Sequence, residues 1–426
     1  MRFKTLDDWL GWLESLHPTA IELGLDRVRQ VAGNLPELSS LQTDRKAKVV
    51  AIAGTNGKGS CIAILENLCI AAGQSVGAYT SPHLLHYSER IRINGQSASD
   101  AQIMSAFEHI DAARGETSLT YFEFGTLAAL LIFVRAGVDN LLLEVGLGGR
   151  LDAVNMVDSD IAVVTSVDLD HQDWLGNDRE TIGREKAGIF RNHKHAICVD
   201  PDPPASLLTI AGDSRVDLLL GGRDISWVAE DNSWTWCGLG HDAQLLEWQD
   251  LPLPRLPLPS VAAALQAFEL LGNSVSAESL TEVLKSTTLP GRCQQLQYRG
   301  KDVTLDVAHN PAAAAYLAER LRASSQGKTL AVFAVMADKD YESMLRALAP
   351  VVDRWFLGGL PGNPRAANPT ELLHSLQALG DQGRSCDTVA TAFAEALEAA
   401  REGDRVLVVG SFYTVAAVLA MVDSEK

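Results

Sequence analysis

Short apolar runs that alternate with helix-forming stretches constrain the fold of this chain more than any other feature. The runs at 48–53, 140–145 and 160–167 are apolar almost without interruption. Strands of this composition are usually covered on both faces, as they are in parallel sheets. Helix-forming stretches such as 60–72 and 121–136 separate the runs. We therefore predict an α/β fold with a doubly wound sheet.

The pattern changes twice along the chain, whose 426 residues exceed the size of one ordinary core. Residues 201–259 are rich in tryptophan and proline and predict a small antiparallel sheet. The Pro-Gly pair at 290–291 breaks regular structure, and the α/β pattern then restarts. We expect a first domain over 1–289, a linker over 290–296 and a smaller α/β domain over 297–426.

Composition excludes several classes of function. Acidic residues outnumber basic ones by 54 to 36, for a formal net charge of −18, which disfavours a nucleic-acid partner. The apolar stretches are too short to span a bilayer, and the amino-terminal segment lacks the apolar core of a signal peptide. The six cysteines form no CxxC pair, so we expect reduced thiols and a cytoplasmic protein.

The segment GTNGKGS at 54–60 is the strongest single motif. It follows a predicted strand and opens a predicted helix, as a phosphate-binding loop does. Lys58 would pair with the β- and γ-phosphates of a nucleotide, and Ser60 would offer its hydroxyl to Mg²⁺. Ile52 and Gly59 depart from the general pattern, so the alternative is an ordinary glycine turn between a strand and a helix. A lysine inside the turn favours nucleotide binding.

Other predicted strands also end in polar groups, where ligands of open α/β sheets bind. Glu144 ends the second apolar run, and its carboxylate is a hard ligand that suits Mg²⁺. The cluster DLDHQD at 168–173 follows the third run; its alternative is a polar loop with a helix N-cap. Farther on, Asn310 would cap a predicted helix. Capping does not explain Asp306 and His309, which could face a ligand cleft.

A series of stretches resembles the Mur-ligase superfamily of ATP-dependent amide ligases, and within it the dihydrofolate synthase/folylpolyglutamate synthase family. They are GTNGKGS (54–60), TSPHL (80–84), ERIR (89–92), TYFEFGT (120–126), EVGLGGRLDAVN (144–155), LDHQDWLG (169–176), REKAGIF (184–190), LPGR (289–292), DVAHNP (306–311) and GSFYTV (410–415). The resemblance covers essentially the whole chain. It implies a P-loop sheet domain that binds ATP and a smaller Rossmann-like α/β domain that closes over the ATP site.

The resemblance implies amide formation in two steps. The γ-phosphate of ATP moves to a substrate carboxylate, and the amine of L-glutamate then attacks the acyl phosphate. Dihydropteroate and reduced folates would be the acceptors; folylpolyglutamate synthesis alone and a cell-wall Mur-type ligation are the alternatives. Two Mg²⁺ ions would offset the repulsion between the anions. We expect only small-molecule partners, neither nucleic acid nor membrane, and a monomer.

The resemblance also implies the residues of the site. Those for ATP are Thr55, Asn56, Gly57, Lys58, Gly59, Ser60, Ser260, Arg292 and Asp306. Those for Mg²⁺ are Ser60, Ser81, Glu144, His171 and Lys186. Those for the pterin or folate are Thr120, Tyr121, Phe122, Glu123, Leu151, Asp152 and Ala153. Lys58, Lys186 and His171 would act in catalysis, with His309 and Asn310 as candidates on the glutamate side.

Three of these assignments compete with other interpretations. By its pattern, 182–190 predicts an amphipathic helix with its charges in solvent, whereas the resemblance implies an N6-carboxylated Lys186 that serves a metal. Ser260 stands where relatives carry Asn, and its shorter side chain leaves recognition of the base open. The alternative for 120–123 is a helix start that packs its aromatic side chains into the core.

Two other classes of protein fit less well. A cell-wall ligase places a nucleotide-sugar domain before the ATP loop, and the 53 residues before Gly54 are too few for one. A GTPase-like switch would need an NKxD motif, and the nearest string, ADKD at 337–340, differs at its first position.

Overall fold

The computed structural model describes residues 2–43, 45–322 and 327–425, which form two compact units. The first unit contains the chain up to His83 together with Tyr87–Thr287. The second contains Leu84–His86 and the chain from Thr288 onward. Leu84 and Leu85 pack against the apolar core of the second unit, although their neighbours in sequence belong to the first.

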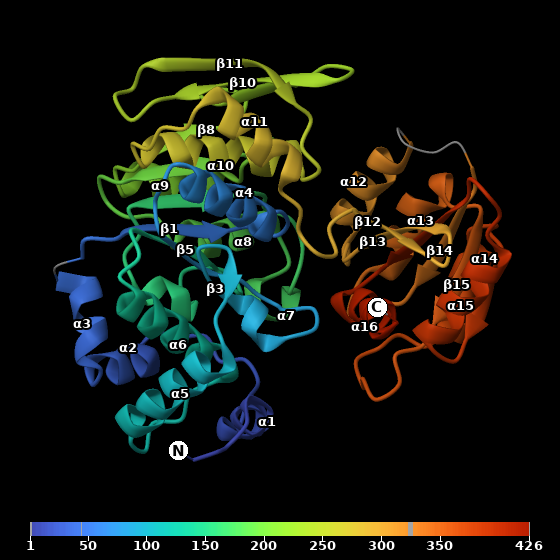
Figure 1. Cartoon of the computed structure of the whole chain (residues 1–426), viewed down its shortest axis with the longest axis horizontal. Helices are drawn as coiled ribbons and strands as arrows, with labels where there is room; N and C mark the ends of the chain where they lie inside the picture. Colours follow the sequence, from blue (N-terminus) through green and yellow to red (C-terminus); the bar gives the residue numbers. More distant parts are fainter. Residues whose placement is uncertain (1, 44, 323–326, 426) are drawn as a thin grey trace. The chain divides into compact units, whose positions relative to one another are not determined.

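The first unit is built on an eight-stranded sheet in the order β4-β3-β2-β5-β1-β6-β7-β8 (Figure 1). The strands are β1 (Lys48–Ala53), β2 (Val76–Tyr79), β3 (Ile91–Ile93), β4 (Gln96–Ser97), β5 (Asn140–Glu144), β6 (Ile161–Val164), β7 (His195–Cys198) and β8 (Asp217–Leu220). All neighbours from β2 to β8 are parallel, whereas β3 and β4 add antiparallel strands at one edge. The predicted parallel α/β sheet is confirmed.

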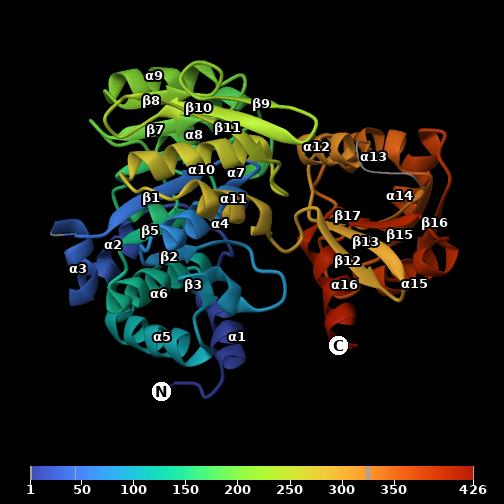
Figure 2. The same ribbon diagram turned by 45° about the horizontal axis from the view of Figure 1, so that its top comes forward.

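Helices cover both faces of this sheet. They are α1 (Leu6–Leu16), α2 (Asp26–Gly33), α3 (Pro36–Thr43), α4 (Lys58–Ala71), α5 (Asp100–Arg114), α6 (Tyr121–Ala136), α7 (Gln172–Leu175), α8 (Arg179–Ala187), α9 (Ala205–Asp213), α10 (Leu258–Leu270) and α11 (Ala277–Ser286), with 3-10 turns η1 (Tyr87–Arg90) and η2 (Ala153–Met156). On one side of the sheet α4 packs on β1, β2 and β5 and α10 packs on β6 and β7, whereas α6 packs on β2 and β3 on the other side (Figures 1 and 2). Val49, Ala51 and Ala53 are two residues apart and therefore lie on the same face of β1. Along that face Val49 joins the core that includes α6, whereas Ala51 and Ala53 join the core that includes α8 and α9.

Strand β6 is shorter than the strand expected over 160–167, because it ends at Val164. Beyond that residue the backbone bonds to the loop after β1: the N–H of Thr55 donates to the carbonyl of Ser166 at 2.8 Å. The polar residues at the end of this apolar run therefore bond to the loop after β1 and do not extend strand β6.

A three-stranded antiparallel sheet holds helix α10 in place. Its strands are β9 (Ser226–Ala229), β10 (Ser233–Leu239) and β11 (Leu245–Pro252). The indole N–H of Trp236 donates to the carbonyl of Ala262 in α10 at 3.2 Å. Gln266, fully buried in the same helix, accepts the N–H of Leu239 at 2.9 Å and donates to its carbonyl at 2.6 Å. These contacts fix the helix that carries Ser260.

The second unit has a six-stranded sheet in the order β12-β13-β17-β14-β15-β16. Its elements are β12 (Gln294–Tyr298), β13 (Lys301–Asp306), α12 (Pro311–Arg322), β14 (Thr329–Phe333), α13 (Tyr341–Leu348), η3 (Ala349–Val351), β15 (Arg354–Gly358), α14 (Pro369–Ala378), β16 (Gly383–Cys386), α15 (Val389–Ala399), β17 (Arg405–Val409) and α16 (Phe412–Ser424). Only β12 is antiparallel to its neighbour. The linker expected over 290–296 is wrong at its end, because 294–296 belong to β12. That edge strand is rich in glutamine, so it lacks the apolar pattern from which the other strands are predicted.

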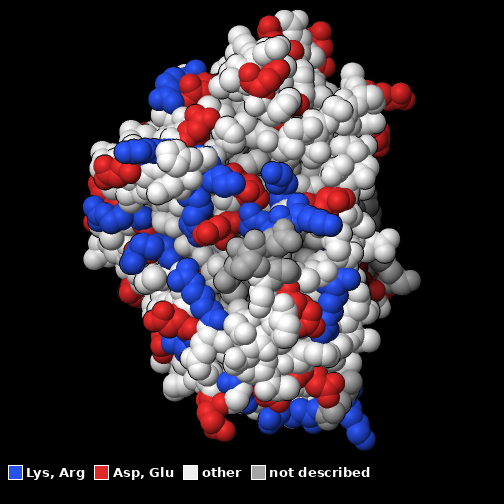
Figure 3. Space-filling view, turned by 90° about the vertical axis from the view of Figure 1, so that its left-hand side faces the viewer, with Lys and Arg blue, Asp and Glu red and all other residues white. Residues whose placement is uncertain are grey.

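Acidic and basic side chains lie interspersed on the face in Figure 3. Among the helices that the structure describes, none is both long and apolar enough to cross a bilayer. All six cysteines are free.

Replacing Gln266 by Leu should lower the free energy of unfolding by about 2–4 kcal/mol, because two buried backbone groups of Leu239 each lose a partner. Urea unfolding followed by circular dichroism measures the change. Gln249→Leu is the matched control, since Gln249 lies on the exposed β11 and bonds the exposed Glu247. Its effect should stay below about 0.5 kcal/mol. Equal losses in the two variants would contradict the role of Gln266.

Candidate active site

The candidate site lies at the carboxyl edge of the first unit's sheet, where β2, β5, β1 and β6 are neighbours. Glu144, the last residue of β5, is in register with Ile52 of β1, and Ala53 of β1 is in register with Val164 of β6. The segments that follow these four strands therefore begin side by side. They are 80–83, 145–152, the phosphate loop 54–60 and the loop 165–171.

The phosphate loop requires glycine at two positions. Gly54 has φ +153° and Gly57 has φ +89°. A Cβ atom would lie 1.9 Å from the Thr165 hydroxyl oxygen at Gly54, and 2.4 Å from the Ser260 hydroxyl oxygen at Gly57. Helix α4 begins directly afterwards at Lys58, whose ammonium donates to the carbonyl of Gly54 at 2.9 Å. The loop thus leads into a helix N-terminus with free N–H groups, which suits phosphate.

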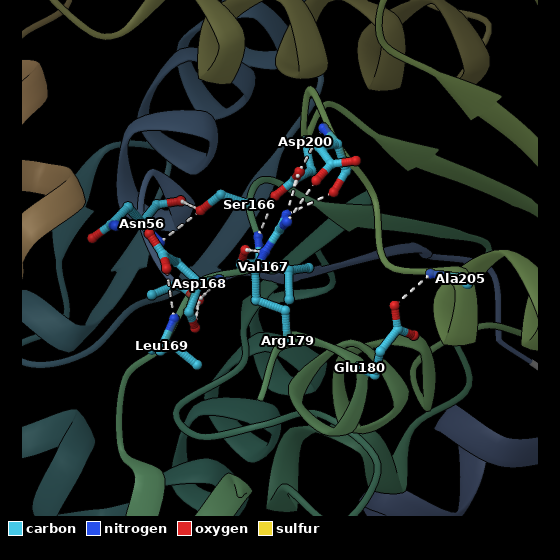
Figure 4. A network of polar contacts seen from close by, with 11 residues as sticks. Asn56, Ser166, Val167, Asp168, Leu169, Arg179, Glu180, Asp200 and Ala205 are labelled. Atoms are coloured by element: carbon cyan, nitrogen blue, oxygen red, sulfur yellow. Dashed lines mark hydrogen bonds and ion pairs between the residues drawn. The ribbon is translucent and has the colours of Figure 1, made fainter. Parts of the chain in front are cut away.

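Hydrogen bonds tie the phosphate loop to the loop 165–171. The Thr165 hydroxyl donates to the carbonyl of Asn56 at 2.6 Å, and the N–H of Asn56 donates to the Ser166 hydroxyl at 3.0 Å (Figure 4). The Thr55 hydroxyl accepts the N–H of Asp168 at 2.9 Å and donates to its carbonyl at 3.1 Å. Thr165 and Ser166 were not among the predicted site residues. The signal that could have revealed them is a polar pair at the end of an apolar strand.

Side chains with oxygen atoms that could bind a metal lie at this edge of the sheet. Glu144 is buried, and its carboxylate accepts the N–H of Ser81 at 3.1 Å. Ser60 is buried in the first turn of α4. Within the described part of the chain, no three His, Cys, Asp or Glu side chains could together hold a metal ion. The hydroxyls of Ser60 and Ser81 and the carboxylate of Glu144 are oxygen groups of the kind that Mg²⁺ prefers. A bound Mg²⁺ usually keeps several of its waters, so it needs few protein ligands.

His171 stands directly before helix α7, in the left-handed region with φ +51°. Its side chain is 43% exposed, whereas that of Asp170 is 9% exposed. The Asp170 carboxylate accepts the N–H of His171 at 2.9 Å. The imidazole is therefore accessible to a ligand, while the neighbouring carboxylate shapes the loop.

Lys186 is buried in helix α8, so the interpretation of a solvated helix face is wrong for this residue. Burial and the charge of Lys58 lower the pKa of Lys186 to about 7, and the charge of Asp170 opposes them. Near neutral pH a large fraction of this amine is uncharged, which is the form that reacts with CO₂. Gly149 lets the loop after β5 approach α8, since a Cβ there would lie 2.7 Å from the Glu185 carbonyl oxygen.

Thr120 and Glu123 cap helix α6. The N–H of Glu123 donates to the Thr120 hydroxyl at 3.2 Å, and the N–H of Thr120 donates to the Glu123 carboxylate at 2.8 Å. This is a capping box, which the spacing T-x-x-E could have revealed. The carboxylate of Glu123 also pairs with Arg27 at 3.1 Å.

The two aromatic residues between them are only partly buried. Tyr121 meets the ring of Tyr87 edge-on at 5.7 Å, and the Arg90 guanidinium lies 5.5 Å from the Tyr121 ring centre. Phe122 approaches Gly146, where a Cβ would lie 2.6 Å from its ring. Both rings pack against the core, so the interpretation as a helix start with packed aromatic side chains holds in part.

The segment Leu151–Ala153, also expected at the substrate, lies at η2. Asp152 is buried and accepts the N–H of Leu147 at 2.8 Å and that of Val154 at 2.9 Å. Burial raises the pKa of Asp152 to about 7, although these hydrogen bonds oppose the rise. Its carboxylate shapes the loop after β5.

In the second unit, two predicted site residues follow or end β13 and bond to the backbone. The Asp306 carboxylate accepts the N–H of Cys293 and that of Ala308, both at 2.8 Å. The side chain of Asn310 accepts the N–H of Ala313 at 2.9 Å, which confirms the predicted cap of α12.

Arg292 and His309 both lie against Phe412. The Arg292 guanidinium is 5.2 Å from the centre of the Phe412 ring, and the His309 ring is 5.9 Å from it. The Nδ1 atom of His309 is 2.9 Å from the carbonyl oxygen of Val307. The second unit therefore gathers a guanidinium, an imidazole and a carboxylate near the end of β13.

Two family models match the chain: the Mur ligase middle domain over residues 52–217, and the Mur ligase glutamate ligase domain over residues 291–412. The chain is 44% identical over 422 residues to the dihydrofolate synthase/folylpolyglutamate synthase of Escherichia coli (strain K12), covering 99% of this chain and 96% of that protein. The structure is similar to that of E. coli FolC in complex with DHPP and ADP, with a TM-score of 0.92, 44% identity and coverage of 99% and 98%. It is also similar, with a TM-score of 0.89 and the same identity and coverage, to a bifunctional folylpolyglutamate synthase/dihydrofolate synthase with Mn, AMPPNP and L-glutamate bound.

Replacing Gly57 by Ala should weaken ADP binding about tenfold to a hundredfold, through backbone strain and displacement of Ser260. Isothermal titration calorimetry measures the affinity. Gly73→Ala is the control, because Gly73 follows the other end of α4 with φ +77° and has open space around it. That variant has similar backbone strain and should bind ADP like the wild type. Unchanged affinity in Gly57→Ala would show that this loop does not hold the phosphates.

Proposed function

Because the chain belongs to the Mur ligase family, as a dihydrofolate synthase/folylpolyglutamate synthase, we propose how its residues carry out the ligation. The chain is an ATP-dependent ligase with both of those activities. Its eight-stranded mixed sheet belongs to the Mur ligase middle domain, and its six-stranded mixed sheet belongs to the glutamate ligase domain. The observation that carries the proposal is the adjacency of four strand ends, which places the phosphate loop beside Glu144 and Ser81.

In this proposal the phosphate loop binds the phosphates of ATP. The N–H groups at the start of α4 and the ammonium of Lys58 face the β- and γ-phosphates. Ser260 lies against Gly57 at the base of the loop. Relatives bind ADP, or AMPPNP with Mn, which supports a nucleotide and a divalent metal here.

The proposed ligands of the divalent metal are all in the first unit. They are Ser60, Ser81, Glu144, His171 and N6-carboxylated Lys186. A bound divalent ion would offset the repulsion between the γ-phosphate and a substrate carboxylate. Buried Glu144 contributes a fixed negative charge, while carboxylation removes the positive charge of Lys186.

The proposed reaction has two steps. A carboxylate oxygen of the substrate attacks the γ-phosphorus, and the bond to the β,γ-bridging oxygen breaks to release ADP. The glutamate amine then attacks the acyl carbon, loses a proton and expels inorganic phosphate. Lys58 remains beside the phosphate oxygens and stabilises the charge that moves from the γ-phosphate to ADP.

Tyr121 and Phe122 are the proposed platform for the pterin, because their partly buried rings offer apolar faces to a flat heterocycle. Thr120, Glu123 and the segment 151–153 would shape this pocket, since their polar groups bond mainly to the protein itself. A relative binds DHPP and another binds L-glutamate.

The second unit supplies the remaining proposed contacts. Arg292 and Asp306 would bind ATP, and His309 would bind the glutamate substrate. Asn310 would act mainly through the cap of α12. A cytoplasmic monomer remains the proposed state of the protein.

Replacing Lys186 by Ala should lower turnover by orders of magnitude, and short carboxylic acids should restore part of it. Arg should not substitute, because it keeps a positive charge beside a metal. The folded-state pKa is lowered, so the amine is neutral above about pH 7 and protonated below it. Labelling with ¹³CO₂ should therefore give a carbamate signal that rises from about one unit below this pKa to about one unit above it. An active Lys186→Arg variant would show that carboxylation is dispensable.

The proposed function is tested by product mass with ATP, Mg²⁺, L-glutamate and either dihydropteroate or a reduced folate. Wild-type protein should make dihydrofolate from the first and polyglutamates from the second; failure with dihydropteroate would overturn the proposal. Phe122→Ala should lose use of dihydropteroate by about tenfold or more, because a stacking face is removed. Val134→Ala, partly buried at the other end of α6, is the control and should keep both activities.

A further inference from the structure

Two charged residues outside the proposed metal and substrate set, Arg179 and Asp200, hold one peptide unit of the loop 165–171. Asp200 is 3% exposed, and its carboxylate accepts the N–H of Val167 at 2.6 Å. The Nε of Arg179 donates to the carbonyl of Val167 at 2.9 Å, and another guanidinium nitrogen pairs with Asp200 at 3.0 Å (Figure 4). Both backbone groups of Val167 are therefore bound by this ion pair, which we name the Val167 clamp.

The loop 165–171 is held from two sides. Ser166 and Asp168 bond to the phosphate loop, as described above, whereas Val167 between them bonds to the clamp. The loop is therefore held between these two sets of bonds. The chain that leads to His171 is thus fixed against the phosphate loop.

Arg179 also connects this loop to helix α8. Its guanidinium donates to the Asp202 carboxylate at 2.8 Å and to the Asp202 carbonyl at 2.6 Å, in addition to its bonds with Val167 and Asp200. Arg179 is the first residue of α8, and Lys186 lies in the last turn of the same helix. The clamp therefore joins the loop that carries His171 to the helix that carries Lys186.

Global stability is a poor explanation for this arrangement. The Arg179 side chain is 36% exposed, and ion pairs of that exposure add little to stability. The planar guanidinium of Arg179 instead donates charged hydrogen bonds to two carboxylates and two carbonyls, and these bonds fix the position of the loop. A lysine ammonium at the same place would not reproduce this set of directed bonds.

We propose that Arg179 and Asp200 are positioning residues for the ligation: they hold His171 and Lys186 at the phosphate loop in the arrangement that serves the metal bound with ATP. This inference rests on the proposed function, which assigns those two residues to the metal. Partners that orient metal ligands commonly matter nearly as much as the ligands themselves.

Amide hydrogen exchange in the ligand-free protein tests the clamp without any reaction. Arg179→Met and Asp200→Asn should speed exchange in the peptide that spans 165–171 by about tenfold. In the wild type the loop must break charged hydrogen bonds in order to open, and these variants lack some of those bonds. Asp160→Asn is the matched control, since Asp160 at the other end of β6 also accepts a backbone N–H, that of Val49 at 3.0 Å, and pairs with Lys194 at 3.0 Å. It should leave exchange in 165–171 unchanged.

Metal binding and kinetics test the functional part. With AMPPNP present, the affinity for Mn²⁺ should fall about tenfold to a hundredfold in Arg179→Met and Asp200→Asn. The kcat should fall with little change in the KM for L-glutamate, and Arg179→Lys should recover only part of the loss. Asp160→Asn should retain wild-type values.

Wild-type Mn²⁺ affinity in Arg179→Met would overturn the positioning role, even if exchange of the loop is faster. So would losses of equal size in Arg179→Met and Asp160→Asn, since both would then reflect general destabilisation. Exchange and Mn²⁺ affinity need no turnover. A wild-type protein that binds Mn²⁺ and AMPPNP but does not ligate would therefore overturn the proposed function and not the clamp.

Discussion

The contact between the phosphate loop and the loop after β6 is the constraint on which the rest of the site depends. Gly54 has no room for a side chain because the Thr165 hydroxyl occupies that space, and the Thr165 hydroxyl bonds back to Asn56. The two loops therefore adopt one joint conformation. Lys58, Ser60 and His171 belong to these loops or to the first turn of α4, and Arg179 joins helix α8, which carries Lys186, to the second loop.

The sequence predicts the sheet and the site to different degrees. Unbroken apolar runs predict parallel strands because both faces must be covered, and the glycine and lysine pattern of 54–60 predicts the phosphate loop by local geometry alone. The end of β6 is not predictable in the same way. Thr165 and Ser166 can extend a strand or bond to a loop, and only the fold brings that loop within 3 Å.

Side chains that the sequence places in the site often support the backbone instead. Thr120, Glu123, Asp152, Asp306 and Asn310 all accept backbone N–H groups. A motif cannot separate the two roles, because a carboxylate that shapes a loop and one that meets a ligand occupy the same positions at strand ends. The burial of Lys186 is also invisible in sequence, since its helix is rich in charged residues.

The short segment Leu84–His86 has a consequence for how this chain can be divided. It lies in the amino-terminal third of the sequence, yet Leu84 and Leu85 pack on the core built by the last third. A fragment that stops at Thr287 would carry two leucines without the surface that covers them. A fragment that starts at Thr288 would lack part of its own interior. Neither half of the gene encodes a finished unit, so insertion, fusion or recombination at that junction separates residues that fold together.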